Sequence, residues 1–223
     1  LPEKLIDWIN QGGRQIGQVM VRPESGGWRL FHQVDEAAAS TGALASFRSP
    51  AEAREIAHHD ASGAFRPLKS APTLKQGWEL FLTTNASLLE ALDYLYPATV
   101  ANWMRFLDGR IPPHTLKETL GRQTGMYRIT GLLREDEAQS LVAATCHDGN
   151  CLRRIQWTWD KQTPWTTLPA EKALCSSPAD PAVPSMPLLC TDACPLLVAA
   201  ARPVVKDRLK AEADAAAAAA LIP

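Results

Sequence analysis

The stretch IGQVMVRPESGGWRLFHQVD, residues 16–35, contains two runs of strand-forming residues with a glycine-containing turn between them. The runs are residues 16–22 and 28–35, and the intervening PESGG supplies the small residues that tight hairpin turns favour. We therefore predict a β-hairpin here, and with it a small sheet near the start of the chain.

Helices are predicted on the C-terminal side of this hairpin. Ser49, Pro50 and Glu52 place an N-cap, a first-turn proline and an acid where a short helix running to about His59 would begin. From Leu74 onward, apolar residues recur at helical intervals through LKQGWELFLT, SLLEALDYLYPATVANWMRFLDG and PHTLKETLGRQ, with a break near Pro97.

The rest of the chain adds mainly helical signals. GMYRITGLL (125–133) predicts a strand or an extended link, and EDEAQSLVAATC a helix that ends at Cys146. A last helix begins after Cys194 and is expected to break at Pro203. We therefore predict an α+β fold, with a small hairpin and helix module at 1–73, a mainly helical domain at 74–210 and a low-complexity tail at 211–223.

Composition and charge exclude some classes of partner. The 223 residues include 23 basic and 24 acidic side chains, and no Lys/Arg block appears that would attract nucleic acid or an anionic membrane. No apolar run approaches the roughly 20 residues of a transmembrane helix, and the N-terminus lacks the pattern of a signal peptide. We expect a cytoplasmic protein that binds neither nucleic acid nor membrane.

Five cysteines lie between residues 146 and 194, and the first 145 residues contain none. CHDGNC (146–151) and CTDACP (190–195) form two close pairs, each at the predicted end or start of a helix. An odd number of cysteines confined to one segment favours metal or redox chemistry over disulfides. Four thiolates suit a [4Fe-4S] cluster or a zinc ion, and the wide spacing within each pair favours the cluster.

The predicted ligands are Cys146, Cys151, Cys190 and Cys194, because short intervals restrict ligand geometry before folding. In a competing set Cys175 replaces Cys146. The start of the last helix would favour a thiolate at Cys194, and Arg153 and Arg154 would favour an anionic centre.

No catalytic residue is predicted. A cysteine nucleophile needs a positioned base, and the neighbouring Cys146 and His147 seldom face each other on a turn. The glycines of QGGRQIGQ precede a strand instead of following one, so a dinucleotide site is not supported.

The cysteine segments, together with YRITGLL, RQTGMYR and ALDYLYPATVANWMRFL, resemble the iron-sulfur region of long CbiX-type sirohydrochlorin chelatases, which are bacterial enzymes of tetrapyrrole synthesis. The resemblance covers about residues 75–210. Upstream, GQVMVRPESGGWRLFHQVD and FRPLKSAPTLKQGW resemble the small stabilising domain that accompanies this region in some members.

The resemblance implies a role in cobalamin or siroheme biosynthesis. No repeated βαβ units with metal-binding histidines appear, so the chain is expected to be a non-catalytic portion. A chelatase domain, in cis or in trans, and an electron-transfer protein would then be its partners. The alternative is a zinc-stabilised, cysteine-rich interaction module without a redox role.

Overall fold

The computed structural model describes residues 2–59, 62–65, 73–110, 114–147, 151–155, 157–160, 185–186 and 188–220. Its α-helices are α1 (Pro2–Asn10), α2 (Glu36–Thr41), α3 (Ala53–Ala57), α4 (Asn85–Leu95), α5 (Thr99–Leu107), α6 (Leu116–Gly121), α7 (Glu135–Val142) and α8 (Pro195–Ala219). Its strands are β1 (Gln15–Ile16), β2 (Val19–Glu24), β3 (Gly27–His32), β4 (Ala45–Phe47), β5 (Trp78–Leu82), β6 (Arg153–Ile155), β7 (Ser185–Met186) and β8 (Leu188–Cys190). Short 3-10 helices are η1 (Gln33–Asp35), η2 (Pro50–Glu52) and η3 (Gly125–Leu132), and η4 (Ala143–His147) is a π-helix.

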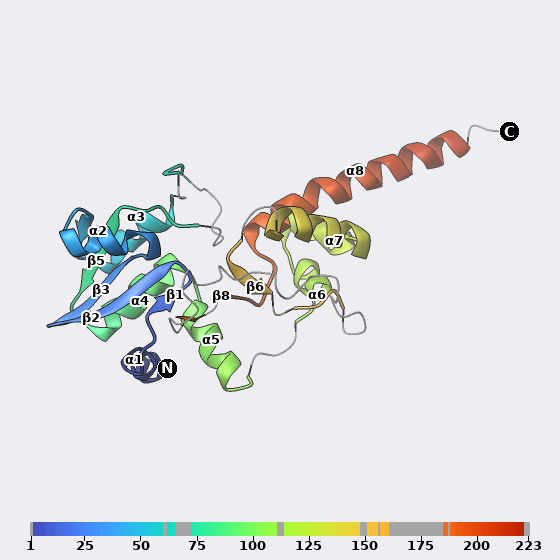
Figure 1. Cartoon of the computed structure of the whole chain (residues 1–223). Helices are drawn as coiled ribbons and strands as arrows, with labels where there is room; N and C mark the ends of the chain where they lie inside the picture. Colours follow the sequence, from blue (N-terminus) through green and yellow to red (C-terminus); the bar gives the residue numbers. More distant parts are fainter. Residues whose placement is uncertain are drawn as a thin grey trace.

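Strands β1 to β5, together with β7, form a mixed sheet with the order β4-β5-β3-β2-β1-β7. Figure 1 shows β1, β2, β3 and β5 in this part of the molecule. The predicted hairpin is confirmed as β2 and β3, which pair antiparallel, and β3 also pairs antiparallel with β5. β4 pairs parallel with β5, and β7 pairs parallel with β1, so a segment from far down the chain completes the sheet. Helices and a mixed sheet together make the protein α+β, as predicted.

The hairpin turn follows from its glycines. Glu24 pairs with Gly27, which leaves Ser25 and Gly26 as a two-residue turn. Gly26 has φ +96°, a backbone conformation that residues with a Cβ rarely adopt. A Cβ at Gly27 would lie 2.0 Å from the carbonyl oxygen of Leu82 in β5, so only glycine lets these strands approach.

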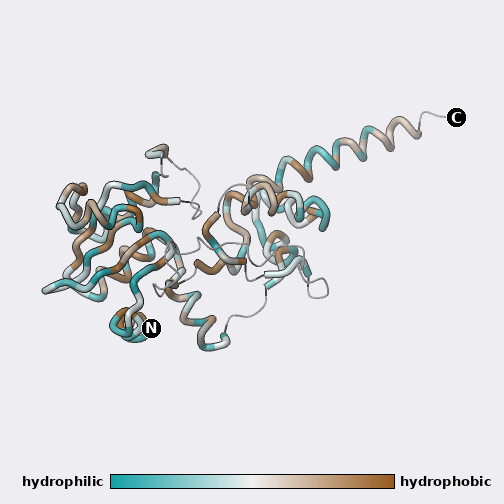
Figure 2. Tube along the Cα trace, in the orientation of Figure 1, coloured by the Kyte–Doolittle hydropathy of each residue, from teal (hydrophilic) through white to brown (hydrophobic). Residues whose placement is uncertain are grey.

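One face of the sheet and the helices α1, α3, α4 and α5 share a first hydrophobic cluster. Its buried members are Leu5, Ile9, Ile16, Val19, Val21, Trp28, Leu30, Ala53, Ile56, Leu74, Trp78, Leu80, Leu82, Leu88, Ala91, Leu92, Leu95, Tyr96, Trp103, Met104, Met186 and Leu188. In Figure 2 brown, apolar residues are concentrated along the strands of this sheet, whereas hydrophilic residues recur along α8.

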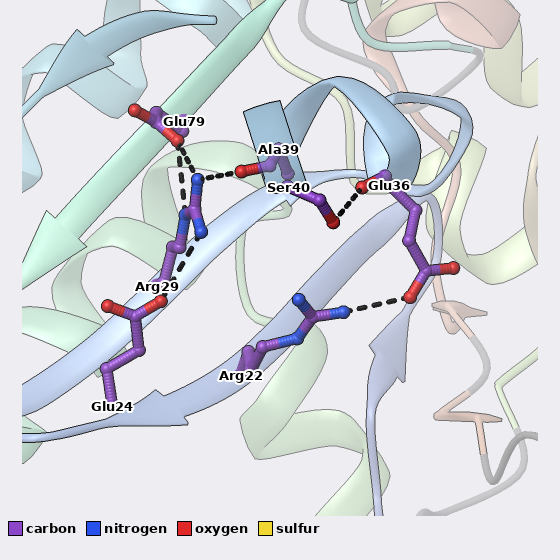
Figure 3. Close-up of polar contacts among 7 residues, drawn as sticks. All are labelled: Arg22, Glu24, Arg29, Glu36, Ala39, Ser40 and Glu79. Atoms are coloured by element: carbon purple, nitrogen blue, oxygen red, sulfur yellow. Dashed lines mark hydrogen bonds and ion pairs between the residues drawn. The ribbon is translucent and has the colours of Figure 1, made fainter. Parts of the chain in front are cut away.

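The opposite face of the sheet carries a buried ion pair beneath α2 (Figure 3). Arg29 Nε donates to Glu79 Oε2 over 3.1 Å, and Arg29 Nη2 donates to the carbonyl oxygen of Ala39 in α2 over 2.6 Å. Nearby, Arg22 Nη2 donates to Glu36 Oε1 over 2.8 Å. These bonds attach α2 to the sheet and satisfy the Glu79 carboxylate, which is nearly inaccessible to solvent.

A second hydrophobic cluster lies among α6, η3, α7 and α8. Its buried members are Leu116, Leu120, Leu133, Ala138, Val142, Cys146, Trp157, Trp159, Leu197, Val198, Ala201 and Val205. β6 and β8 form a separate parallel pair beside it. Figure 1 shows α6, α7 and the first part of α8 gathered around these strands, while the C-terminal part of α8 extends away from them.

Several local predictions are confirmed and three need correction. Ser49 and Glu52 form the predicted capping box, and α7 continues through η4 to Cys146. The predicted helix over LKQGWELFLT is wrong, because residues 78–82 pair with two strands and form an interior strand of the sheet. The predicted strand or extended link at 125–133 is instead the 3-10 helix η3.

The expected break at Pro203 is also wrong, since α8 continues through this residue. Burial of Leu197, Ala201 and Val205 on both sides of the proline offsets the hydrogen bond that it cannot donate. The domain boundary predicted between residues 73 and 74 stays a prediction. The first sheet and the first hydrophobic cluster extend past it, because both include Trp78 and Met186.

In the described ranges, every helix is too short or too polar to span a bilayer.

Candidate metal centre

The first cysteine pair is held by the end of α7. That helix widens into the π-helical turn η4, which contains the buried Cys146. The backbone N–H of Cys151 donates to the carbonyl oxygen of Cys146 over 3.1 Å, so the chain returns to the turn that it has just left. Cys151 is half-buried and packs against the second hydrophobic cluster.

The second pair joins β8 to α8. Cys190 is the last residue of β8, where it lies opposite Ile155 of β6. Cys194 is the N-cap of α8, as predicted, and its Sγ accepts a hydrogen bond from the backbone N–H of Leu197 over 3.4 Å. The sulfur therefore lies at the positive end of a 25-residue helix.

The structure brings the four predicted cysteines into one neighbourhood, and all four are free thiols. Burial raises the pKa of Cys146 above its ordinary value, and repulsion by the other three thiolates raises this pKa further. Burial likewise raises the pKa of Cys190 to about 11 and raises that of Cys151. The site therefore disfavours an accumulation of thiolates until a cation binds among them.

Three of the sulfurs accept hydrogen bonds from N–H groups. The backbone N–H of Arg153 donates to Cys151 Sγ, and the indole Nε1–H of Trp157 donates to Cys190 Sγ over 3.4 Å. The third is the bond from Leu197 to Cys194. Such donors stabilise the charged form of a thiol, and in both Cys151 and Cys190 they oppose the effect of burial on the pKa.

Arg153 is the cation beside the site. Its positive charge lowers the pKa of Cys151 and of Cys190. Its guanidinium is held in place by two carbonyl oxygens, that of Leu189 at 3.0 Å from Nη1 and that of Pro97 at 3.3 Å from Nη2. Arg153 therefore connects the cysteine centre to the turn between α4 and α5.

Trp103 does not belong to the cysteine centre. It lies in the first hydrophobic cluster, 5.5 Å from Trp8 between ring centroids. Cys175, the alternative ligand, and Trp165 lie outside the described residues. Sequence reasoning missed the contact of Arg153 with Pro97, for which the sequence contains no local signal.

The donor chemistry suits an iron-sulfur centre. A negatively charged, thiolate-bound cluster requires thiol ligands, hydrogen-bond donors to sulfur and nearby positive charge. The site supplies four thiols, three N–H donors to sulfur and one guanidinium. The buried Trp157 and Trp159 also limit access of water. Within the described ranges, no three His, Cys, Asp or Glu side chains are grouped to hold a metal ion. The four cysteines therefore suit a cluster by the chemistry of their thiols and because all four lie in or pack against the second hydrophobic cluster.

Comparison with protein families identifies the class of each half. Residues 108–203 match the family model of a 4Fe-4S iron-sulfur cluster binding domain, and residues 1–106 match that of the DR2241 stabilising domain. The cofactor of the second half is therefore a [4Fe-4S] cluster, and this match selects the cluster over the zinc ion that the cysteine spacing also allowed.

A solved structure similar to the chain is that of DR2241 from Deinococcus radiodurans. It superposes with a TM-score of 0.71 at 29% sequence identity, covering 92% of this chain and 41% of that one. The chain thus spans about two fifths of the length of DR2241, which is described as a multi-domain protein with structural similarity to chelatases and with two additional novel domains. Comparison with functionally curated proteins finds no match.

Proposed function

We propose that this chain is the [4Fe-4S]-binding accessory portion of a CbiX-type sirohydrochlorin chelatase, acting in cobalamin or siroheme biosynthesis in the bacterial cytoplasm. Its cluster ligands are Cys146, Cys151, Cys190 and Cys194. The observation that supports the proposal is that these four free thiols lie in or pack against one hydrophobic cluster, within the segment that matches an iron-sulfur family.

The chain's own residues hold and shield the cluster. Each ligand belongs to a different piece of backbone: the η4 turn, the start of the β6 segment, the end of β8 and the N-cap of α8. Trp157 and Leu197 direct N–H groups at two of the sulfurs, and Arg153 offsets negative charge. A bound cluster would supply one-electron chemistry and four strong cross-links between these pieces.

Among the roles that the sequence allows, which are electron transfer, redox sensing and structural support, the geometry favours structural support. β6 and β8 each contain three residues, and such a short pair of parallel strands has little stability of its own. Ligation would join both strands to α7 and α8. Redox activity of the cluster is then not required for the chain to serve its partner.

The chelatase assignment is supported by the similarity of this chain to a solved structure. The solved relative is described as similar to chelatases, and this chain matches less than half of its length. We therefore propose that a chelatase domain, in cis or in trans, performs metal insertion and that this chain supports it.

The test begins with protein purified without oxygen. We expect a brown protein with about four irons and four sulfides per chain. Serine substitution of Cys146, Cys151, Cys190 or Cys194 should abolish cluster retention, with Cys175→Ser as the matched control that keeps it. Colourless protein containing one zinc would instead support the zinc-stabilised interaction module. Loss of the cluster in Cys175→Ser but not in Cys146→Ser would establish the competing ligand set.

The same samples test whether the chain binds a chelatase domain. The cluster-loaded chain is mixed with a separately produced CbiX-type chelatase domain, and association is measured by size-exclusion chromatography with light scattering. We expect a complex with the loaded chain and a weaker one with Cys151→Ser. An absence of association in both samples would remove the chelatase assignment while leaving the cluster assignment intact.

A further inference from the structure

A cleft of about 440 Å³ lies between η3 and α8, apart from the cysteine centre. Its lining residues are Tyr127, Ala199, Arg202, Pro203 and Lys206. The α8 members recur at intervals of three and four residues, so they form one stripe of the helix. Arg202 follows Cys194 by eight residues, about 12 Å along the helix axis.

Arg202 lacks a good hydrogen-bond acceptor. Its Nε is buried and has no partner among the described residues. Its Nη1 lies 3.0 Å from the thioether sulfur of Met126, which is a weak acceptor, and its guanidinium lies over the Tyr127 ring with 5.7 Å to the centroid. A guanidinium held in one place with unsatisfied donors is suited to an anion that enters from the cleft.

Lys206 adds a second positive charge one helical turn away. Like charges at this spacing repel each other, and neither Arg202 nor Lys206 forms an ion pair within the described part of the chain. Arg208 of the same helix shows the contrast, because it bonds Glu137 over 2.7 Å and also contacts Glu212. Among the described residues, the helix thus pairs Arg208 with two carboxylates and provides no such partner for the two cations of the cleft.

We propose that this cleft binds a small oxyanion, a carboxylate or a phosphate, between Arg202 and Lys206, with Tyr127 as its aromatic wall. The guanidinium supplies planar donors, the ammonium a flexible charge, and both are functional groups that bind carboxylate and phosphate. The volume of the cleft is that of a small-molecule site. The proposal does not depend on the chelatase assignment.

The test is calorimetric titration of the cluster-loaded chain at low ionic strength with inorganic phosphate, with succinate and with the neutral analogue succinamide. We expect saturable binding of at least one anion and none of succinamide. Arg202→Gln and Lys206→Gln should each weaken binding by about tenfold or more. Lys210→Gln, one turn further along α8 and exposed, is the matched control and should bind as the unmodified chain does.

The outcomes separate the ligand classes. Tighter binding of succinate identifies a carboxylate site, and tighter binding of phosphate identifies a phosphate site. The proposal is overturned if neither anion binds, or if Lys210→Gln weakens binding as much as Lys206→Gln does, because the effect would then be one of general charge. Lys206 is exposed, so its variant tests the site even if Arg202→Gln fails to fold.

Discussion

Single N–H groups and one guanidinium set the chemistry of the cysteine centre. Burial makes three of the four thiols poor acids, so each must lose a proton when a metal binds. Hydrogen bonds to Cys151 and Cys190, together with the charge of Arg153, partly offset that cost. Residues that are not ligands therefore control how tightly the cluster is held.

Trp157→Phe should speed oxidative loss of the cluster. The substitution keeps an aromatic ring over the site but removes the N–H donor to Cys190 Sγ. A neutral hydrogen bond contributes about 0.5–1.5 kcal/mol, so we expect bleaching in air to be about two- to tenfold faster. Trp157→Ala, which also opens the site to water, should bleach faster still.

The measurement is the decay of visible absorption after exposure to air. Trp103→Phe serves as the control, since Trp103 is equally aromatic but lies in the first hydrophobic cluster. Equal decay rates for Trp157→Phe and the unmodified protein would show that the indole does not protect the cluster.

At the scale of elements, local signals predicted the boundaries that depend on neighbouring residues. The capping box of Ser49, the hairpin turn at Gly26 and the helix start at Cys194 appear where the sequence placed them. β5 did not follow its local pattern, because its residues find hydrogen-bond partners in β3 and β4. Tertiary pairing overrides a weak helical periodicity in so short a segment.

Gly27→Ala should destabilise the sheet. The added methyl group would lie 2.0 Å from the backbone oxygen of Leu82, which cannot move without separating β3 from β5. Overpacking of this kind typically costs about 1–3 kcal/mol of the free energy of unfolding.

Urea unfolding followed by fluorescence measures this cost. Gly121→Ala in α6 is the matched control, because its new Cβ meets no atom within 4 Å and its backbone is helical. We expect the control to be unchanged or more stable by roughly 0.5–1 kcal/mol. A Gly27→Ala protein as stable as the control would show that the strands can separate without cost.

At the scale of the whole molecule, residues 185–186 and 188–191 contact both halves. Met186 pairs with Ile16 at the edge of the first sheet, and Leu188 belongs to the first hydrophobic cluster. Cys190 follows in β8, and Thr191 accepts a hydrogen bond from Asn102 of α5 over 3.5 Å. The N-terminal half therefore positions one of the four proposed ligands.

Leu188→Ala should weaken cluster retention as well as stability. Truncating a fully buried leucine costs about 2–5 kcal/mol, and here the cavity lies two residues from Cys190. Leu80→Ala is a matched control, because Leu80 is equally buried in the same cluster but lies in β5.

Iron release to a chelator under native conditions distinguishes the two variants. We expect faster release from Leu188→Ala than from Leu80→Ala when the two have similar free energies of unfolding. Equal release rates would mean that packing at Leu188 affects cluster retention no more than packing elsewhere in the first hydrophobic cluster does.

Patterns in the amino-acid sequence predicted the hairpin, the capped helices, the α+β class and a thiolate-bound metal centre, for which they favoured a [4Fe-4S] cluster over zinc. The hairpin and the helix caps depend on residue types within a few positions of one another, and each close cysteine pair lies within six residues. The fold was needed to show that β5 is a strand, that β7 joins the first sheet, and that Arg153 connects the cysteines to Pro97. These contacts join residues far apart in the chain, and no local pattern encodes such a pairing.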